Sequence, residues 1–245
     1  QVILTRTGET YARQVQQALA RIAEATAAVI GSDERTIRLK MPPTFAVRWF
    51  VPRLGSLHAR FPEMAVQVTT SHDPVDFGAD DVHAAVTYGP ALGDGMAGER
   101  LFREVLIPVC SPALALPRPV PGARELADQT LLHSLRRPDD WPRWFAAAGA
   151  PGIELKRTLV LENSSLTYQG AIDGLGLALA QVAFVADELR SGQLSCPLPV
   201  TVERDSGYFM AYPKERAQQR RIRLLHEWIA AEAALTRQAR PRDRL

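Results

Sequence analysis

The sequence has little cysteine, and this limits the frameworks on which its fold can rest. Its two cysteines, Cys110 and Cys196, lie far apart and form no Cys-x-x-Cys pair. A fold held by disulfides or by a structural zinc site is therefore not expected. The scarcity is typical of a reducing compartment, so we expect a cytoplasmic protein that carries no metal or other cofactor.

Long apolar segments and a strong charge of one sign are also missing. No apolar run approaches the roughly 20 residues that cross a bilayer, and no signal peptide opens the sequence. We therefore expect neither a membrane protein nor an exported one. With 29 Lys and Arg against 27 Asp and Glu, the net charge of +2 gives no basis for nucleic-acid binding over the whole surface. The basic end, residues 237–245, is interpreted as a solvated tail.

Motifs for catalysis and nucleotide binding are absent too. The sequence contains no Gly-x-Ser-x-Gly elbow, no P-loop and no His-Glu-x-x-His helix. Gly174-Leu175-Gly176 follows a predicted helix and lacks a third glycine, so it is not a dinucleotide fingerprint. His72 and Asp73 are open to two interpretations: an acid–base pair working with a serine, or a polar pair in a loop. We prefer the second, and we expect a binding protein rather than an enzyme.

The most informative apolar segment is residues 105–112, in which Val105, Leu106, Ile107 and Val109 predict a buried strand. Pro108 has no N–H group to give to a sheet, so the strand must lie at an edge or leave the sheet at that point. We interpret the segment as a crossover between two halves of the molecule. A cleft for a small molecule would then lie beside it.

Residues 9–30 contain no proline or glycine and predict a long helix. Its apolar residues recur in alternating steps of four and three, a period of about 3.5 that favours pairing with another helix. One interpretation is an ordinary amphipathic helix packed on its own core. We prefer an exposed dimerisation seam, because Gly31-Ser32-Asp33 separates the helix from the first strand. The seam residues are Tyr11, Val15, Ala18, Ile22, Ala25 and Val29.

Short strands alternate with helices through the rest of the chain, which predicts a parallel sheet. Residues 1–8 are interpreted as a strand end and turn. Further strands are predicted at residues 36–41, 66–70, 82–88, 131–133, 159–161, 177–180 and 207–212. Helices are predicted after Pro42 with a restart at Pro52, from Asp139, up to Asp173, from Phe184 to Ser191 and from Lys214 to Leu235.

Polar side chains gather where these strands end, and ligands of such sheets bind outside the carboxyl ends of the strands. Thr44 is placed to cap the helix after the first strand, residues 69–73 follow the second, and Asn163 or Ser164 can cap the helix after residue 161. Crossings near residues 105–111 and 199–205 would form a double hinge between the two halves. Hydroxyls, an amide and helix starts would face each other across that hinge.

Several segments also match one protein family in order and spacing. They are Leu4-Thr5-Arg6-Thr7-Gly8, Pro42-Pro43-Thr44-Phe45-Ala46, Arg48-Trp49-Phe50-Val51-Pro52-Arg53-Leu54, Val86-Thr87-Tyr88-Gly89, Pro108-Val109-Cys110-Ser111-Pro112, Gly174-Leu175-Gly176-Leu177-Ala178-Leu179 and Asp187-Glu188-Leu189-Arg190-Ser191-Gly192-Gln193-Leu194. Together they cover nearly the whole chain. The sequence resembles the LysR-type transcriptional regulators, especially the branch that includes the activator of the glycine-cleavage operon.

The resemblance implies an α/β fold: a long linker helix, then two Rossmann-like lobes of the periplasmic-binding-protein type joined by a two-strand hinge. It implies the ligand-sensing domain of a DNA-binding transcription factor that works as a homodimer or homotetramer. DNA contact would belong to a winged helix-turn-helix outside these 245 residues. The implied domains are the wing remnant and linker helix at 1–35, lobe I at 36–108 and 206–236, lobe II at 109–205 and the tail at 237–245.

Carried over by position, the resemblance implies an effector cleft between the lobes. The capped helix starts would suit a small effector such as a carboxylate or an amino acid. The residues of the cleft would be Pro43, Thr44, Phe45, Thr70, Ser71, His72, Tyr88, Gly89, Asn163, Ser164 and Gln181. The hinge between the lobes would contain Pro108, Val109 and Cys110. Where the branch usually has Asp-Leu-Ala-Ile-Arg-Tyr-Gly, this chain has His83-Ala84-Ala85-Val86-Thr87-Tyr88-Gly89, so a carboxylate and an arginine are lost. The alternative with the same cleft is a solute-binding protein of a transport system, which would be an exported monomer.

Overall fold

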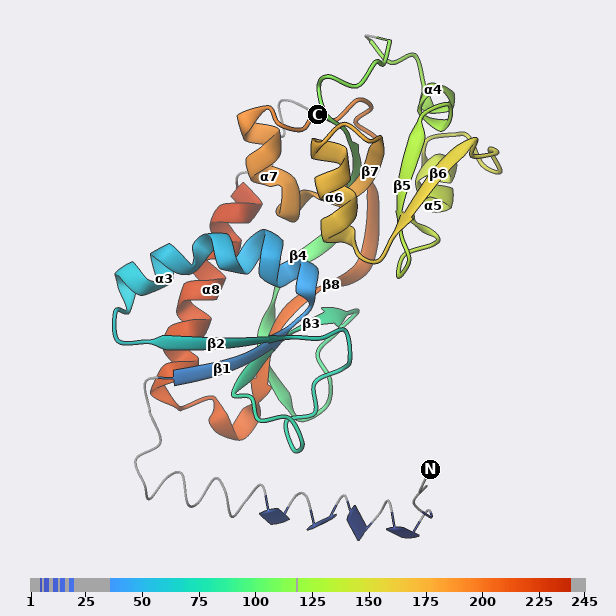
Figure 1. Cartoon of the computed structure of the whole chain (residues 1–245). Helices are drawn as coiled ribbons and strands as arrows, with labels where there is room; N and C mark the ends of the chain where they lie inside the picture. Colours follow the sequence, from blue (N-terminus) through green and yellow to red (C-terminus); the bar gives the residue numbers. More distant parts are fainter. Residues whose placement is uncertain are drawn as a thin grey trace.

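A computed structural model describes residues 36–117 and 119–238, and before them Thr5, Thr7, Gly8, Tyr11, Ala12, Gln14, Val15, Ala18 and Leu19 (Figure 1). The strands are β1 (Thr36–Met41), β2 (Ala65–Thr70), β3 (Ala84–Gly89), β4 (Met96–Val109), β5 (Thr130–Ser134), β6 (Arg157–Leu161), β7 (Leu177–Gln181) and β8 (Val202–Pro213). The helices are α2 (Pro43–Phe45), α3 (Leu54–Arg60), α4 (Ala123–Ala127), α5 (Asp140–Ala147), α6 (Ser164–Ile172), α7 (Val182–Ser191) and α8 (Arg220–Gln238).

The strands form one mixed sheet in the order β2-β1-β3-β8-β4-β7-β5-β6. Pairing is parallel at both ends, where β1 lies between β2 and β3, and β5 lies between β6 and β7. It is antiparallel in the centre, where β8 pairs with β3 and β4, and β4 also pairs with β7. The prediction of a parallel sheet is therefore wrong for the centre, because β4 and β8 run in opposite directions between the two ends of the sheet (Figure 1).

Pro108 occupies the position in the sheet that its missing N–H group predicts. Strand β4 pairs with β8 only as far as Leu106, opposite Val202, but it pairs with β7 through Val109. One side of β4 is therefore free of the ladder at Pro108, although β4 is a central strand elsewhere. The chain leaves the strand at Cys110, whose backbone forms an isolated bridge with Ser195.

The long pair formed by β4 and β8 contains a close approach that only glycine permits. Gly98 in β4 lies opposite Ala211 at a φ of +144°, and a Cβ atom there would collide with the carbonyl oxygen of Met210. Residues other than glycine rarely adopt this backbone conformation. The register then shifts between Arg100 and Phe102 and again between Arg103 and Glu104. Such irregularities bend a strand, so β4 changes direction where it passes from one end of the sheet to the other.

Helix α8 completes the core at the end of the sheet formed by β1–β3. The face of α8 that packs on this core carries Ile222, Leu225, Trp228 and Ile229, which are all buried. The indole of Trp228 donates to Ser56 Oγ at 2.8 Å and packs edge-on against Phe50 at 5.6 Å. The last segment of the chain therefore packs on an early one. This arrangement agrees with a discontinuous first lobe, whose limits at residues 108 and 206 stay a prediction.

A second buried cluster lies beside β5 and β7. Trp141, Trp144 and Phe145 of α5 are fully buried, and their rings lie 5.2–5.8 Å apart. The indole N–H groups donate to the carbonyl oxygens of Leu132 and Val200 at 3.0 and 2.8 Å. These aromatic residues therefore form a packed core, and each of the two indole N–H groups has its hydrogen-bond partner.

Several predicted helix boundaries are wrong. Thr44 does not cap the first helix: the cap is Pro42, with no side-chain hydrogen bond, and Thr44 is buried within the first turn after Pro43. The helix does not restart at Pro52. It continues through a π-helical segment (Ala46–Phe50) and a 3₁₀ segment (Val51–Arg53) into α3. In the π segment each backbone hydrogen bond spans five residues instead of four. This change of hydrogen-bond pattern comes just before Pro52, which has no N–H group to donate.

Three further boundaries differ from prediction. Thr7 and Gly8 are helical rather than part of a strand end and turn. The closing helix is divided into a 3₁₀ turn (Lys214–Arg216) and α8. Arg237 belongs to α8, where its guanidinium donates to the carbonyl oxygen of Leu101, so the tail does not begin there.

The predicted dimerisation seam is described only in part. Tyr11, Val15 and Ala18 have helical backbone and exposed side chains, and Tyr11 is 70% exposed. Ile22, Ala25 and Val29 lie outside the described residues. In the part of the chain that the structure describes, no helix has the length and apolar character to cross a bilayer.

Gly98→Ala tests the close approach of β4 to β8. The added Cβ collides with backbone atoms in a strained conformation, so we expect the free energy of unfolding to fall by about 3 kcal/mol or more. Gly55→Ala is the matched control, because no atom lies within 4 Å of its Cβ position in α3. That variant should gain about 0.5–1 kcal/mol. Urea unfolding measures both, and a similar small change in the two variants would contradict the packing described for Gly98.

His83 gives the fold a predicted dependence on pH. Its Nδ1 atom accepts a hydrogen bond from the Arg38 N–H at 2.9 Å, and burial, with the charges of Arg221, Arg38 and Arg216, lowers its pKa from 6.5 to about 4. Between these values the unfolded chain binds a proton that the folded chain excludes, so stability falls as the pH falls. The loss should reach about 3 kcal/mol.

The measurement is urea unfolding at pH 7 and near pH 4.5 for the natural chain and His83→Asn. Asparagine places an oxygen acceptor close to the position of Nδ1 but takes up no proton. The difference in stability between the two chains should therefore change with pH in favour of the variant at low pH. Parallel pH profiles would show that His83 is not the group responsible.

Candidate functional site

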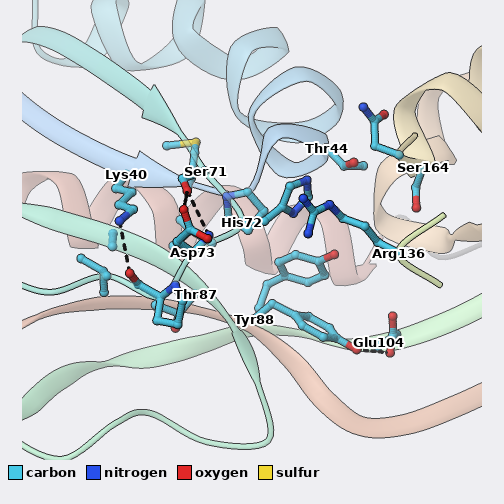
Figure 2. Close-up of a pocket in the computed structure, with 18 of the residues that line it drawn as sticks. Lys40, Thr44, Ser71, His72, Asp73, Thr87, Tyr88, Glu104, Arg136 and Ser164 are labelled. Carbon is cyan, nitrogen blue, oxygen red and sulfur yellow. Dashed lines mark hydrogen bonds between the residues drawn. The ribbon is translucent and has the colours of Figure 1, made fainter. Parts of the chain in front are cut away.

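A cavity of about 450 Å³ lies where the two ends of the sheet face each other. One wall is formed by residues at and after the carboxyl ends of β1, β2 and β3. The other is formed by residues at the end of β5, in the turn after it, and at the start of α6 (Figure 2). Residues of β4, β7 and β8 lie between the walls. The polar lining residues are Lys40, Thr44, Ser71, His72, Asp73, Thr87, Tyr88, Glu104, Ser134, Arg136, Arg137, Asn163, Ser164, Tyr168, Gln181 and Tyr208.

The structure brings together most of the residues predicted to bind an effector. Those that line the cavity are Thr44, Ser71, His72, Tyr88, Asn163, Ser164 and Gln181. Pro43, Phe45, Thr70 and Gly89 are not among its lining residues. Phe45 instead lies fully buried among aromatic rings, 5.0 Å from Trp49 and 5.7 Å from Tyr208, because it faces the core from the first helical turn.

The loop after β2 is fixed by local hydrogen bonds. The Ser71 N–H donates to the carbonyl oxygen of Met41 at 3.1 Å, and Ser71 Oγ accepts from the Asp73 N–H at 2.9 Å. The Ser71 hydroxyl also lies 3.1 Å from the Asp73 carboxylate. Asp73 is thus engaged with Ser71 in a loop, as expected from the preferred interpretation. Burial lowers the pKa of His72, and the charge of Arg136 lowers it further.

The opposite wall is built at the start of α6. Asn163 caps this helix, since its side-chain oxygen accepts from the Leu166 N–H at 3.2 Å, which confirms a sequence prediction. Ser164 follows within the first turn and lines the cavity. A helix start presents backbone N–H groups without intrahelical partners, so this wall favours groups that accept hydrogen bonds.

Gln181 lines the cavity, but its amide is already engaged. Oε1 accepts from the Val105 N–H at 2.7 Å, and Nε2 donates to the Arg103 carbonyl at 2.8 Å. Its own N–H donates to Tyr168 Oη at 3.1 Å. Gln181 therefore joins β7 to the bent part of β4, and it supports the cavity from below.

A buried charge cluster forms part of the cavity floor, and sequence reasoning missed it. Glu104 is 1% exposed, and its carboxylate accepts from Tyr88 Oη at 2.6 Å and from the guanidinium of Arg137. Arg137 also donates to Asp140 at 2.6 Å, and Arg204 donates to Asp140 at 2.5 Å. Only the pair of Arg137 and Asp140 is close in sequence, so no local pattern could have revealed the cluster.

The cluster perturbs the groups around it. Burial raises the pKa of Tyr88, and the hydrogen bond to Glu104 raises it further. Burial alone would lower the pKa of Arg137, but Asp140 and Glu104 raise it above its usual value. Two carboxylates and two guanidiniums thus balance each other in a place with little water, and they join β3, β4, β8 and the start of α5.

The hinge residues lie at the end of β4, where Val109 and Cys110 are buried. Cys110 and Ser195 exchange backbone hydrogen bonds at 3.0 and 2.8 Å. Their role as a hinge stays a prediction. Among the described residues, no group of three or more His, Cys, Asp or Glu side chains is placed to hold a metal ion.

Comparison with known proteins identifies the family to which this fold and cavity correspond. A family model described as the LysR substrate binding domain matches residues 31–234. The glycine cleavage system transcriptional activator of Escherichia coli K12 is 30% identical over 235 residues, which are 95% of this chain and 77% of that protein. The transcriptional activator AmpR of Pseudomonas aeruginosa is 30% identical over 241 residues, or 98% and 80% of the two chains.

Solved structures agree with these sequence matches. The effector domain of AmpR from P. aeruginosa superposes with a TM-score of 0.70 at 28% identity, over 84% of this chain and 99% of that one. The AmpR effector-binding domain from Citrobacter freundii has the same fold, with a TM-score of 0.68 at 22% identity, over 82% and 99%. These relatives are transcriptional regulators, which favours the regulatory prediction over the transport and enzyme alternatives.

Glu104→Gln tests the charge cluster. The substitution leaves two guanidiniums facing one carboxylate in a buried place, so we expect the free energy of unfolding to fall by about 3 kcal/mol. Asp128→Asn is the matched control, because Asp128 and Lys156 form an ion pair at 2.6 Å that is more than half exposed on both sides. Its loss should cost less than about 1 kcal/mol. Equal urea midpoints for the two variants would contradict a stabilising role for the cluster.

Proposed function

Because the chain belongs to the LysR substrate binding domain family, it is the effector-binding regulatory domain of a LysR-type transcriptional regulator, and we infer that its cavity is the effector site. The observation that carries this inference is the origin of the lining residues. Ser71 and Tyr88 come from the β1–β3 end of the sheet, and Asn163 and Ser164 from the β5–β7 end. A volume of about 450 Å³ suits a small molecule.

A ligand held between the two walls would change the balance between more open and more closed arrangements. A ligand shifts such an equilibrium by its difference in affinity for the two states. The walls meet through β4 and β8, so contacts to both walls at once favour the closed arrangement. Residues 108–110 would then act as one hinge, and the chain near residues 199–205 as the other.

The effector that this lining favours is a small carboxylate or an amino acid. The start of α6, the hydroxyls of Thr44, Ser71 and Ser164, and the side chain of Asn163 all supply polar atoms to the cavity. Hydroxyls and helix starts are donors to carboxylate oxygens. The lining also contains carboxylates, Asp73 among them, which suit a ligand with an ammonium group.

LysR-type regulators bind DNA and form oligomers. We propose a cytoplasmic homodimer or homotetramer in which the leading helix pairs the subunits. The exposed side chains of Tyr11, Val15 and Ala18 support this role, because they are three positions of the apolar seam. DNA contact would be made by a winged helix-turn-helix joined to that helix.

Thr44→Val tests the effector site. In a thermal-shift screen of carboxylates and amino acids, a ligand at a hundredfold excess over its dissociation constant should stabilise the natural chain by about 2.7 kcal/mol. Thr44 is 7% exposed and lines the cavity, so replacing its hydroxyl by a methyl group should reduce the shift without changing the volume of the side chain. Thr201→Val, at an exposed position that does not line the cavity, is the control.

The shift should persist in Thr201→Val and decrease in Thr44→Val. A ligand that stabilises both variants as strongly as the natural chain binds elsewhere, and the assignment of the cavity would then be wrong. The melting temperatures without ligand show whether either substitution disturbs the fold itself.

A further inference from the structure

Among the residues that the structure describes, one cation of the cavity has no anionic partner. Lys40 donates to Asp80 at 2.7 Å, and Arg137 donates to Asp140 at 2.6 Å and to Glu104. Arg136, in the turn after β5, lines the same cavity but makes no hydrogen bond or ion pair with any residue that the structure describes. Its guanidinium is exposed within the cavity and is available to an incoming anion.

A buried hydroxyl nearby also lacks a partner. Ser134 is the last residue of β5 and is 8% exposed, yet its Oγ atom has no hydrogen-bond partner among the described residues. Ser134 lines the cavity two residues before Arg136. An unpartnered buried hydroxyl is unfavourable, so its presence points to a group that is bound when the protein works.

The start of α6 stands on the same wall. This helix has nine residues, its cap Asn163 is engaged with Leu166, and Ser164 faces the cavity. In Figure 2, Ser164 and Arg136 extend into the cavity from the same side. The partial positive charge of a helix start adds to the full charge of the guanidinium.

We propose that Arg136, Ser134 and the start of α6 form a subsite for one anionic group of the effector, a carboxylate or a phosphate. This inference rests on the proposed function, since it assigns a ligand group within the same cavity. The guanidinium offers two parallel N–H donors to two oxygens of the anion, the geometry in which arginine binds either group. The hydroxyl of Ser134 and the first N–H groups of α6 are donors of the same kind.

His72 faces this subsite from the other wall, and its charge responds to the anion (Figure 2). Burial lowers the pKa of His72 and Arg136 lowers it further, while Glu162 and Asp73 raise it. An anion on Arg136 offsets the charge of the guanidinium and raises the pKa of His72. Binding and protonation therefore support each other, and the anion binds more tightly as the pH falls into the range in which His72 takes up its proton.

The test is an NMR titration of the 245-residue chain with sodium acetate, sodium succinate and sodium phosphate at constant ionic strength. The backbone amides of Ser164 and Ser165 and the Arg136 Nε–H should respond in a saturable way. Arg136→Gln should weaken binding about tenfold or more, because a hydrogen bond to a charged group is lost. Arg143→Gln is the matched control, since Arg143 is exposed on α5 and does not line the cavity.

The three anions and the pH separate the remaining alternatives. A stronger response to acetate or succinate than to phosphate assigns the subsite to a carboxylate, and the reverse assigns it to a phosphate. Acetate stays ionised over this range, so its binding should strengthen from pH 7.5 to pH 5.5, and His72→Gln should remove that change. Equal affinities of the natural chain and of Arg136→Gln for all three anions would overturn the subsite.

Failure of the subsite and failure of the effector site have different signatures. If Thr44→Val loses the metabolite shift but Arg136→Gln binds anions as the natural chain does, the cavity is the effector site and the subsite is wrong. If Arg136→Gln loses anion binding but Thr44→Val keeps the metabolite shift, these residues bind an anion, but the effector binds elsewhere and the assignment of the anion to an effector group is wrong. No saturable response of the natural chain to any of the three anions also refutes the subsite.

Discussion

The antiparallel pairing of β4 with β8 holds the two ends of the sheet together, and the other features of the site depend on it. The pair begins tightly packed at Gly98, where a side chain would collide with Met210, and it bends where its register shifts near Glu104. The bend sets the angle between the walls of the cavity. It also places Glu104 below the cavity, where its carboxylate meets groups from both ends of the sheet.

The charges in and around the cavity are arranged by burial. At the floor, Glu104 and Asp140 neutralise Arg137 and Arg204, and the desolvation of these groups makes their mutual contacts necessary. At the rim, Arg136 is exposed and forms no ion pair with a residue that the structure describes. The floor thus contributes to stability, and the rim carries the proposed anion subsite.

The sequence predicted the parts of the fold that short-range patterns determine. Strand β1 has the predicted bounds, and Asn163 caps α6. The family resemblance placed Ser71, Tyr88 and Ser164 in one cavity. Two features could be recognised only in the three-dimensional structure. The central pairing is antiparallel because β4 and β8 cross the molecule in opposite directions. Glu104 forms ion pairs with Arg137 and Arg204, which are too far from it in the sequence for a local pattern to predict the contacts.

The packing of α8 against the segment that begins at Pro43 affects the order in which a ribosome can complete this molecule. Strands β5–β7 and their helices are contiguous in the chain, so they can fold as soon as they emerge. The β1–β3 end must wait for β8 and α8, which are synthesised last. During translation its apolar face, including Ile37 and Leu39, stays uncovered although it was made first. The earliest part of the nascent domain is therefore the part that most needs a chaperone.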